Sequence, residues 1–295
     1  MFAGLMMVVI LAESNPALKQ RTGVGRHGEL RLHFTDIQQQ TSLQESFFRP
    51  PLQVMRAITD AAGCMVIYIL SPTGGVVQGD QYDLRIVLEP HTHALITTIA
   101  ATKVYRMPDD CATQHVHIEV GEGAILEFLP DALILFKDAD YHQHMDVTLH
   151  NGAVCLLQDI VLGGRVARDE VLQFRRFSNR IRVQDAQGLL LVDTMDFSPT
   201  AEDIERSGLL DGFPCWASWY MLGDLSAWNL DAAQFCQTHH VVESPHAIGS
   251  MSTLYRNGLV ARMLSHRLET VTHTFEDLRR HFRHTIGRPY SDLRK

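Results

Sequence analysis

The chain has 295 residues, 45% of them hydrophobic and 20% charged, which is typical of a soluble globular protein rather than of a disordered or membrane-embedded chain. Its formal net charge is −8, and Lys and Arg do not cluster before the C-terminal tail, so the composition argues against a nucleic-acid partner. Five widely spaced cysteines without a Cys-x-x-Cys pair argue against a disulfide framework and favour reduced thiols in the cytoplasm.

The N-terminal segment MFAGLMMVVILA is apolar, but it lacks the basic residues that open a signal peptide and is too short to span a bilayer. We interpret residues 1–24 as an N-terminal extension or a first strand, with a misassigned start codon as the alternative. Residues 25–295 contain no linker rich in Pro, Ser or Gly, so we expect a single β-rich domain. No membrane partner is expected.

Short alternating or apolar runs predict the first strands, at 29–34, 52–56 and 65–70. The segment that follows, PTGGVVQGD at 72–80, has three glycines in nine residues. Glycine gives the backbone the freedom that a sharp turn or a close chain crossing requires. No helix signal follows these glycines, so they do not indicate a phosphate-binding loop.

A repeated phrase occupies the middle of the chain, between Leu84 and Arg168. DLRIVLEPHTHALITTIAATKVYR, HVHIEVGEGAILEFLPDALILFKD and HMDVTLHNGAVCLLQDIVLGGRVA align without gaps, and Ala94 is followed by Ala124 after 30 residues and by Ala153 after 29 more. One such strand pair cannot bury its apolar face alone, so the repeat predicts stacked β units. This pattern indicates a scaffold before it indicates a catalyst.

The C-terminal third mixes strands with two helices. Alternation continues through 174–197 around a Gln187-Gly188 turn, GFPCWASWYML indicates another strand, and Asn257-Gly258 between two apolar runs predicts a hairpin. A short helix is expected at 230–241 and a longer one at 269–284. The longer helix has one apolar face, formed by Val271, Phe275, Leu278 and Phe282. This face either packs on the chain's own sheet or docks a helical partner.

Histidine is abundant, with 16 copies, and occurs in three His-x-His pairs: His91/His93, His115/His117 and His142/His144. Residues i and i+2 of a strand point to the same side, so each pair could present two imidazoles to one metal ion. This spacing also opens the metal motif of cupin barrels, which makes a cupin-like metal-dependent enzyme the alternative function. The third ligand and the glycine of that motif do not follow at the right distance, and solvated imidazoles on exposed strands are the simpler interpretation.

Three aspartates stand where the pattern predicts burial. Asp159 interrupts VCLLQDIVLGG, Asp193 interrupts GLLLVDTMDF, and Asp80 closes the glycine-rich turn. An ionised carboxylate is costly to remove from water, so each is expected to be paired, protonated, hydrogen-bonded to backbone N–H groups or exposed to an internal water path. Oxygen ligands along a polar passage would conduct a divalent cation without holding it tightly.

Four ordered blocks resemble the urease accessory proteins of the UreD/UreH type: SPTGGVVQGD, LITTIAATKVYR, ILEFLPDALILF and GGRVARDE. The resemblance runs from about residue 25 into the C-terminal hairpin. It implies a mainly β fold, a helicoid or solenoid-like stack of β-sheets with a small α-helical C-terminal part. Carried over by position, the family motif comprises Gly74, Gly75, Gly79, Thr97, Thr98, Lys103, Tyr105, Glu127 and Pro130.

The resemblance also implies a function. A protein of this type is a non-catalytic chaperone that binds urease apoprotein and recruits a helical accessory protein of the UreF type and a nickel-carrying GTPase of the UreG type. No cofactor is expected to be bound stably, because nickel is in transit. Combining this with the buried carboxylates, we hypothesise that Asp80, Asp159 and Asp193, with Thr102 as a neutral oxygen donor, line or gate a nickel route.

Overall fold

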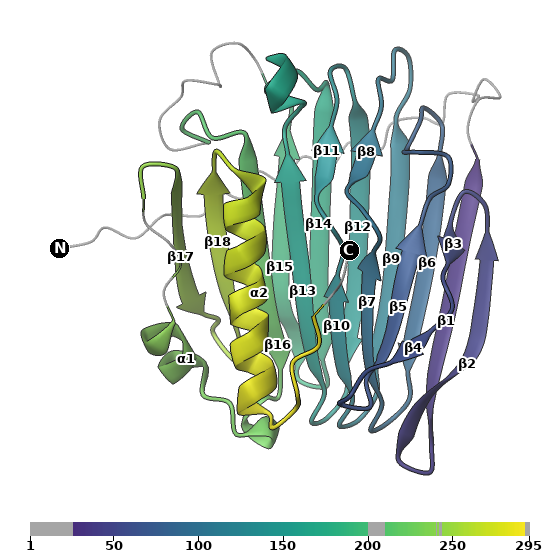
Figure 1. The fold of residues 1–295 in the computed structure, drawn as a ribbon, viewed down its shortest axis with the longest axis vertical. Coiled ribbons are helices and arrows are strands. Elements are labelled where there is room, and N and C mark those ends of the chain that lie inside the picture. The colour runs from purple at the N-terminus through teal and green to yellow at the C-terminus, as the bar shows by residue number, and fades with distance from the viewer. Residues whose placement is uncertain (1–25, 200–209, 240, 242–243, 293–295) are drawn as a thin grey trace.

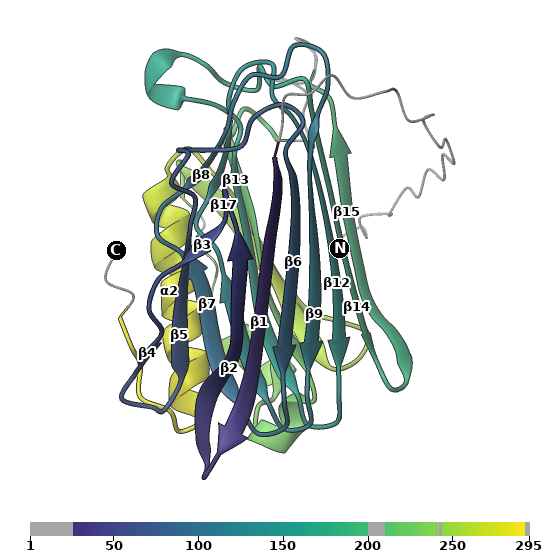
Figure 2. The ribbon, with the colours of Figure 1, turned by 90° about the vertical axis from the view of Figure 1, so that its right-hand side faces the viewer.

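Two β-sheets lie face to face, and helices cover the outer side of one of them (Figures 1 and 2). The computed structural model describes residues 26–199, 210–239, 241 and 244–292. The expected first strand or extension at 1–24 lies outside the described residues. Among the described helices, none is long and apolar enough to cross a membrane.

The seven-stranded sheet contains the first strand of each repeat at its centre. In spatial order it consists of β15 (Gly188–Phe197), β14 (Arg176–Asp185), β12 (Asp140–Leu149), β9 (Ala112–Val120), β6 (Gln81–Leu88), β1 (His27–Ile37) and β2 (Gln40–Arg49). Its inward residues alternate with polar outward ones, as expected for a sheet with one face in water.

The eleven-stranded sheet contains the second strand of each repeat. Its main path is β17 (Ala247–Thr253), β18 (Gly258–Ser265), β16 (Cys215–Gly223), β13 (Val154–Leu162), β10 (Ile125–Leu129), β7 (His93–Thr98), β5 (Met65–Leu70) and β3 (Gln53–Val54). Short strands flank this path: β4 (Ile58–Thr59) pairs with β5, and β11 (Leu133–Leu135) pairs with β13 and with β8 (Thr102–Val104). The run expected at 52–56 forms only the two residues of β3.

The three repeats stack in register, which confirms the solenoid-like fold predicted from the sequence. Strands β6, β9 and β12 pair in parallel, as do β7, β10 and β13. Ala94, however, pairs with Leu126 and not with Ala124, so the first step is 126 − 94 = 32 residues, whereas Leu126 to Cys155 is 29. The alanine spacing of 30 therefore does not mark the first stacking step; the two-residue difference keeps the same face inward.

Two apolar cores result from this arrangement. The first fills the space between the sheets and the second lies between the eleven-stranded sheet and α2 (Leu268–Thr285). The four apolar residues of α2 are at most 3% exposed, so this helix face packs on the chain's own sheet and is not a docking surface. Burial of each such side chain contributes roughly 2 kcal/mol.

The remaining C-terminal elements agree with the expectations. The hairpins β14–β15 and β17–β18 form, and Asn257 takes the left-handed conformation (φ 47°) that the second turn requires. The short helix α1 (Ala232–Thr238) begins where Asp231 accepts hydrogen bonds from the N–H groups of Ala233 and Gln234. Two 3₁₀ turns, at Val166–Arg168 and Leu225–Trp228, complete the described elements.

The topology overturns the cupin alternative. A jelly roll consists of antiparallel strands. Here the three repeats pair in parallel within both sheets, so the His-x-His pairs do not lie in a cupin barrel.

Candidate functional site

A cavity of about 260 Å³ lies between the two sheets. Its wall includes buried side chains of both sheets, such as Phe128 and Tyr141, and exposed residues at one end, such as Ile99 and Lys103. The cavity therefore reaches the surface near the ends of β7 and β8. Among the four residues hypothesised to form a metal route, Asp159 and Thr102 line this cavity.

A row of amide side chains crosses the cavity wall on the seven-stranded sheet. Gln114, Gln143 and Asn179 occupy paired positions on β9, β12 and β14, and all three line the cavity. Tyr82 continues the row on β6, opposite Gln114. An apolar inter-sheet core thus contains one polar row of hydrogen-bonding groups, which we call the amide row.

Asp159 faces the amide row from the opposite sheet. It lies on β13, and one of its carboxylate oxygens accepts a hydrogen bond of 2.7 Å from Asn179. Burial and the negative charge of Asp193 raise the pKa of Asp159 to about 6, against the opposing effect of the Asn179 bond. No lysine or arginine among the described residues forms an ion pair with it. A carboxyl group in this state can exchange a proton or a cation near neutral pH.

The other two aspartates are engaged in local structure. Asp80 is 2% exposed, and its carboxylate accepts hydrogen bonds from the N–H groups of Arg26 and Val77 and from the Tyr82 hydroxyl. Asp193, on edge strand β15, forms an ion pair of 2.7 Å with Arg262 and accepts a hydrogen bond from Tyr220. Neither residue is part of the cavity wall. Asp193 influences the cavity through its charge, which acts on Asp159.

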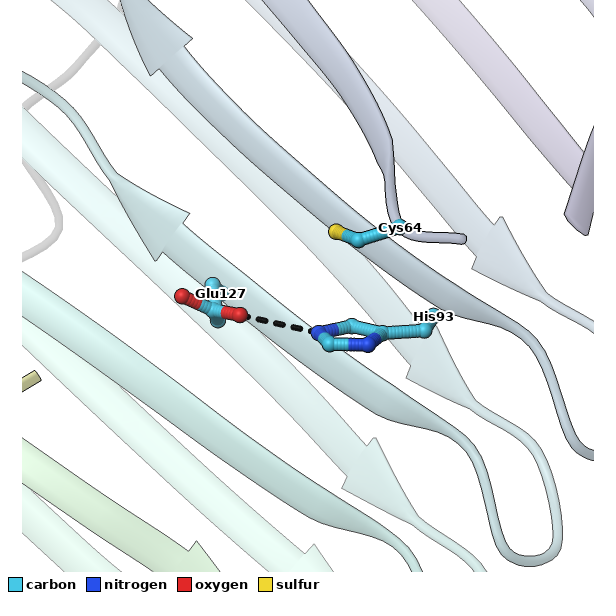
Figure 3. Close-up of side chains that lie close together, drawn as sticks. All are labelled: Cys64, His93 and Glu127. Carbon is cyan, nitrogen blue, oxygen red and sulfur yellow. Dashed lines mark hydrogen bonds and ion pairs between the residues drawn. The ribbon is translucent and has the colours of Figure 1, made fainter. Parts of the chain in front are cut away.

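A second polar cluster lies beneath α2, on the other side of the eleven-stranded sheet. Figure 3 shows its centre, where Glu127 of β10 meets His93 of β7 beside Cys64, the residue before β5. One Glu127 oxygen lies 2.8 Å from His93 Nε2 and 2.6 Å from Arg283 Nε, and the other lies 2.7 Å from Arg279 Nε. Arg279 and Arg283 belong to α2. We call these five residues the Glu127 cluster.

Protonation in the Glu127 cluster follows from its burial and its two guanidinium groups. Burial alone would raise the pKa of Glu127, but Arg279, the His93 bond and Arg283 together hold it well below its ordinary value. Burial lowers the pKa of His93 and raises that of the Cys64 thiol. Glu127 is therefore an anion and Cys64 a neutral thiol at neutral pH.

The donor atoms of Cys64, His93 and Glu127 lie within 4.8 Å of one another, close enough to suggest a metal site. The chemistry does not fit, because a metal needs a thiolate and unoccupied carboxylate oxygens. Both Glu127 oxygens already face cations, and two arginines would repel a dication. The cluster instead ties α2 to the sheet.

The His-x-His pairs separate in the fold. His91 lies in the turn before β7 with φ 62°, whereas His93 is buried in the Glu127 cluster, so this pair does not face one ion. His115 and His117 project from β9 on the outer face of the seven-stranded sheet, next to His144 of β12. His142 is engaged by Asp140 at 2.8 Å, and this bond raises its pKa to about 9.

Comparison with known proteins identifies the family. The profile of the UreD urease accessory protein family matches residues 26–295. Urease accessory protein UreD of Haloarcula marismortui is 30% identical, covering 85% of this chain and 84% of its own length. Urease accessory protein UreD 2 of Streptomyces griseus is 31% identical, covering 91% of this chain and 93% of its own length. UreD of Deinococcus radiodurans is 31% identical, covering 92% of this chain and 94% of its own length. The chain belongs to the UreD family of urease accessory proteins.

Membership in the UreD family implies a role in urease maturation, and it is consistent with a protein that is not an enzyme, since the relatives are named accessory proteins. Two of the blocks that carried the resemblance meet at the open end of the cavity. Val76, in the glycine-rich turn, exchanges backbone hydrogen bonds with Lys103 and Tyr105. A side chain at Gly75 would lie 2.4 Å from the Lys103 carbonyl oxygen, and Gly79 has φ 82°, so this UreD protein needs glycine at both places.

The remaining motif residues hold neighbouring strands together. Thr97 Oγ1 donates to the Leu129 carbonyl at 2.6 Å, and Thr98 Oγ1 accepts from the Asp131 N–H at 2.8 Å. The Pro130 carbonyl accepts from Gln158 at 2.9 Å. These bonds link β7, β10 and β13 where the cavity wall passes from one strand to the next.

Sequence reasoning missed the amide row and the cluster partners of Glu127. Gln114, Gln143 and Asn179 carried a usable signal, since each stands at an inward position of an alternating strand where an aliphatic residue is expected. Arg279 and Arg283 lie beside the apolar stripe of α2, each one residue beyond a member of it, Leu278 and Phe282. Charge inside an apolar stripe requires a buried partner, but the sequence does not say which one.

Proposed function

We propose that this protein is a non-catalytic urease maturation scaffold, which binds urease apoprotein in the cytoplasm and recruits a UreF-type helical accessory protein and a UreG-type GTPase for nickel insertion. The single observation that carries this proposal is the family match across residues 26–295, which spans both sheets and the C-terminal helix. All five cysteines are free, as suits a reducing compartment.

We further propose that nickel passes through the cavity between the sheets. One feature supports this: the amide row with Asp159 provides oxygen donors along the wall of a single cavity. Nickel in water is held by oxygen ligands, so amide, hydroxyl and carboxylate oxygens could replace part of its hydration without trapping it. Thr102 contributes a further hydroxyl to the same wall.

The geometry narrows the sequence hypothesis about the route. Of the three hypothesised aspartates, Asp159 lines the wall, and the charge of Asp193 adds to burial in raising the pKa of Asp159. Asp80 orders the glycine-rich turn next to Tyr82, a residue of the wall. We therefore expect Asp159 to matter for nickel itself, and Asp80 and Asp193 to matter through the shape and charge of the wall.

Coexpression of the chain with the urease subunits and the other accessory proteins tests the proposal. The wild-type chain should copurify with urease, and the urease should contain nickel by elemental analysis. Asp159→Ala should keep the complex together and lower the nickel content, with Asp80→Ala and Asp193→Ala tested in parallel. Failure to copurify would contradict the scaffold, whereas normal nickel in all three variants would contradict the route alone.

A further inference from the structure

The outer face of the seven-stranded sheet carries three imidazoles and a carboxylate on two adjacent strands. His115 and His117 lie on β9, and His144 and Asp146 lie on β12. Parallel pairing places His144 opposite His115 and Asp146 opposite His117. All four side chains are exposed and project from the same face. We call these four residues the histidine array.

Two sequence motifs converge in the histidine array. The pair His115/His117 lies on β9 and the pair His142/His144 on β12. The strands align with an offset of 29 residues, so His115 lies opposite His144 and not opposite His142. Their rings lie 5.4 Å apart, centre to centre. Among the described residues, no hydrogen bond or ion pair engages His115, His117 or His144. The imidazoles are therefore available to a ligand.

We propose that the histidine array binds one late first-row dication such as Ni²⁺ or Zn²⁺ on the surface, separate from the cavity. Neutral imidazole is a preferred ligand of these metals, and ligands at i and i+2 of one strand together with a residue of the next strand can converge on one ion. His115 and His144 supply the first two nitrogens, His117 the third and Asp146 an oxygen. Exposed side chains rotate within nanoseconds, so the rings can turn toward a shared ion.

The surroundings of the array favour nitrogen-seeking metals over hard cations. A hollow of about 240 Å³ adjoins it, lined in part by His144, Asp146 and Arg180. Arg182 Nη1 lies 3.9 Å from Asp146 Oδ1. Arg85, on the neighbouring strand β6, occupies the position opposite His117. The positive charge of these arginines would repel a dication that was held by charge alone, so the affinity must come from the metal–imidazole bonds. Mg²⁺, which prefers oxygen ligands, is not expected to bind here.

His142 is the natural internal comparison. It shares a strand and a spacing with His144, but its ring nitrogen is bonded to Asp140, which in turn holds Arg175. The His142/His144 pair therefore does not form a chelate of its own. The array uses the cross-strand neighbour His115 in place of His142.

Calorimetric titration of the full-length, tag-free chain with NiCl₂, ZnCl₂ and MgCl₂ tests the proposal. Ni²⁺ and Zn²⁺ should show a one-to-one binding event, and Mg²⁺ should show none. His115→Ala and His144→Ala should each weaken Ni²⁺ binding by at least the roughly tenfold that loss of even an outer-shell partner costs. The double variant should abolish the event.

Two controls keep the test specific. His150→Ala removes another exposed imidazole, which contacts Glu119 outside the array, and should leave Ni²⁺ binding unchanged. Cys64→Ser changes the Glu127 cluster and should also leave it unchanged. Retention of the binding event in the double variant, or its loss in either control, would overturn the proposal. Thermal melts should show that the array variants remain folded, since their side chains are exposed.

Discussion

The cavity between the sheets and the Glu127 cluster both place polar groups inside apolar cores, but they satisfy those groups differently. Glu127 meets two guanidinium groups and an imidazole within 2.8 Å, and its pKa is driven down. Asp159 has one amide partner and a cavity beside it, and its pKa is driven up. A closed cluster favours a fixed structure, whereas a carboxyl group left with spare bonding capacity is a candidate for function.

The largest effect is expected from Glu127→Gln. It removes the anion that Arg279 and Arg283 share and leaves Arg283 with Asp60 at 3.3 Å, which should lower the free energy of unfolding by about 3–5 kcal/mol. Urea denaturation at pH 7 measures it. If the variant does not fold, Glu127→Met combined with Arg279→Met should restore folding, because that pair of charges is removed together while Arg283 keeps its ion pair with Asp60. A Glu127→Gln protein as stable as wild type would show that the cluster does not hold α2.

Asp159→Asn should act in the opposite direction. Because Asp159 must ionise with a raised pKa, the neutral amide should stabilise the protein by about 1–2 kcal/mol at pH 7, a value reduced for partial exposure. The gain should be complete above pH 6, shrink as the pH falls toward the ordinary value near 3.8 and vanish below it. Denaturation at pH 4 and pH 7 checks this, and a destabilised variant at pH 7 would place Asp159 with the structural groups.

Ionisation of Glu127 should stabilise the fold, whereas ionisation of Asp159 destabilises it. Its folded pKa lies below the ordinary value near 4.5, so its contribution is complete above that pH and is lost as the pH falls below it. The stability difference between wild type and Glu127→Gln should therefore narrow in acid. Denaturation midpoints between pH 3 and pH 7 measure it, and a difference independent of pH would contradict the ionised state assigned to Glu127.

Thr102→Val should have the smallest effect on stability, within about 0.5 kcal/mol, because the two side chains are similar in shape and no described hydrogen bond involves the Thr102 hydroxyl. It should nevertheless reduce nickel incorporation into urease, since a wall oxygen is removed. Thr113→Val, on the outer face of β9, is the matched control and should leave nickel incorporation unchanged. Equal nickel content in the two variants would remove Thr102 from the route.

The fold was largely predictable because it depends on repeated local patterns. Alternation in β6, β9 and β12, the Asn257-Gly258 turn and the apolar stripe of α2 each specify an element through neighbours in sequence. The position of Asp159 was predictable in the same way, as a charge in an aliphatic strand. The partners were not, because Asn179 is 20 residues away and Arg279 is 152 residues from Glu127. Pairing across layers depends on packing that the local pattern does not encode.

The decisive experiment determines the nickel content of urease matured with the Asp159→Asn chain. This variant should be at least as stable as wild type and should still copurify with urease, so a change in nickel cannot be attributed to misfolding. Urease from the intact complex should contain less nickel than urease matured with the wild-type chain. A nickel content equal to that obtained with the wild-type chain would contradict a role for the Asp159 carboxylate in nickel transfer.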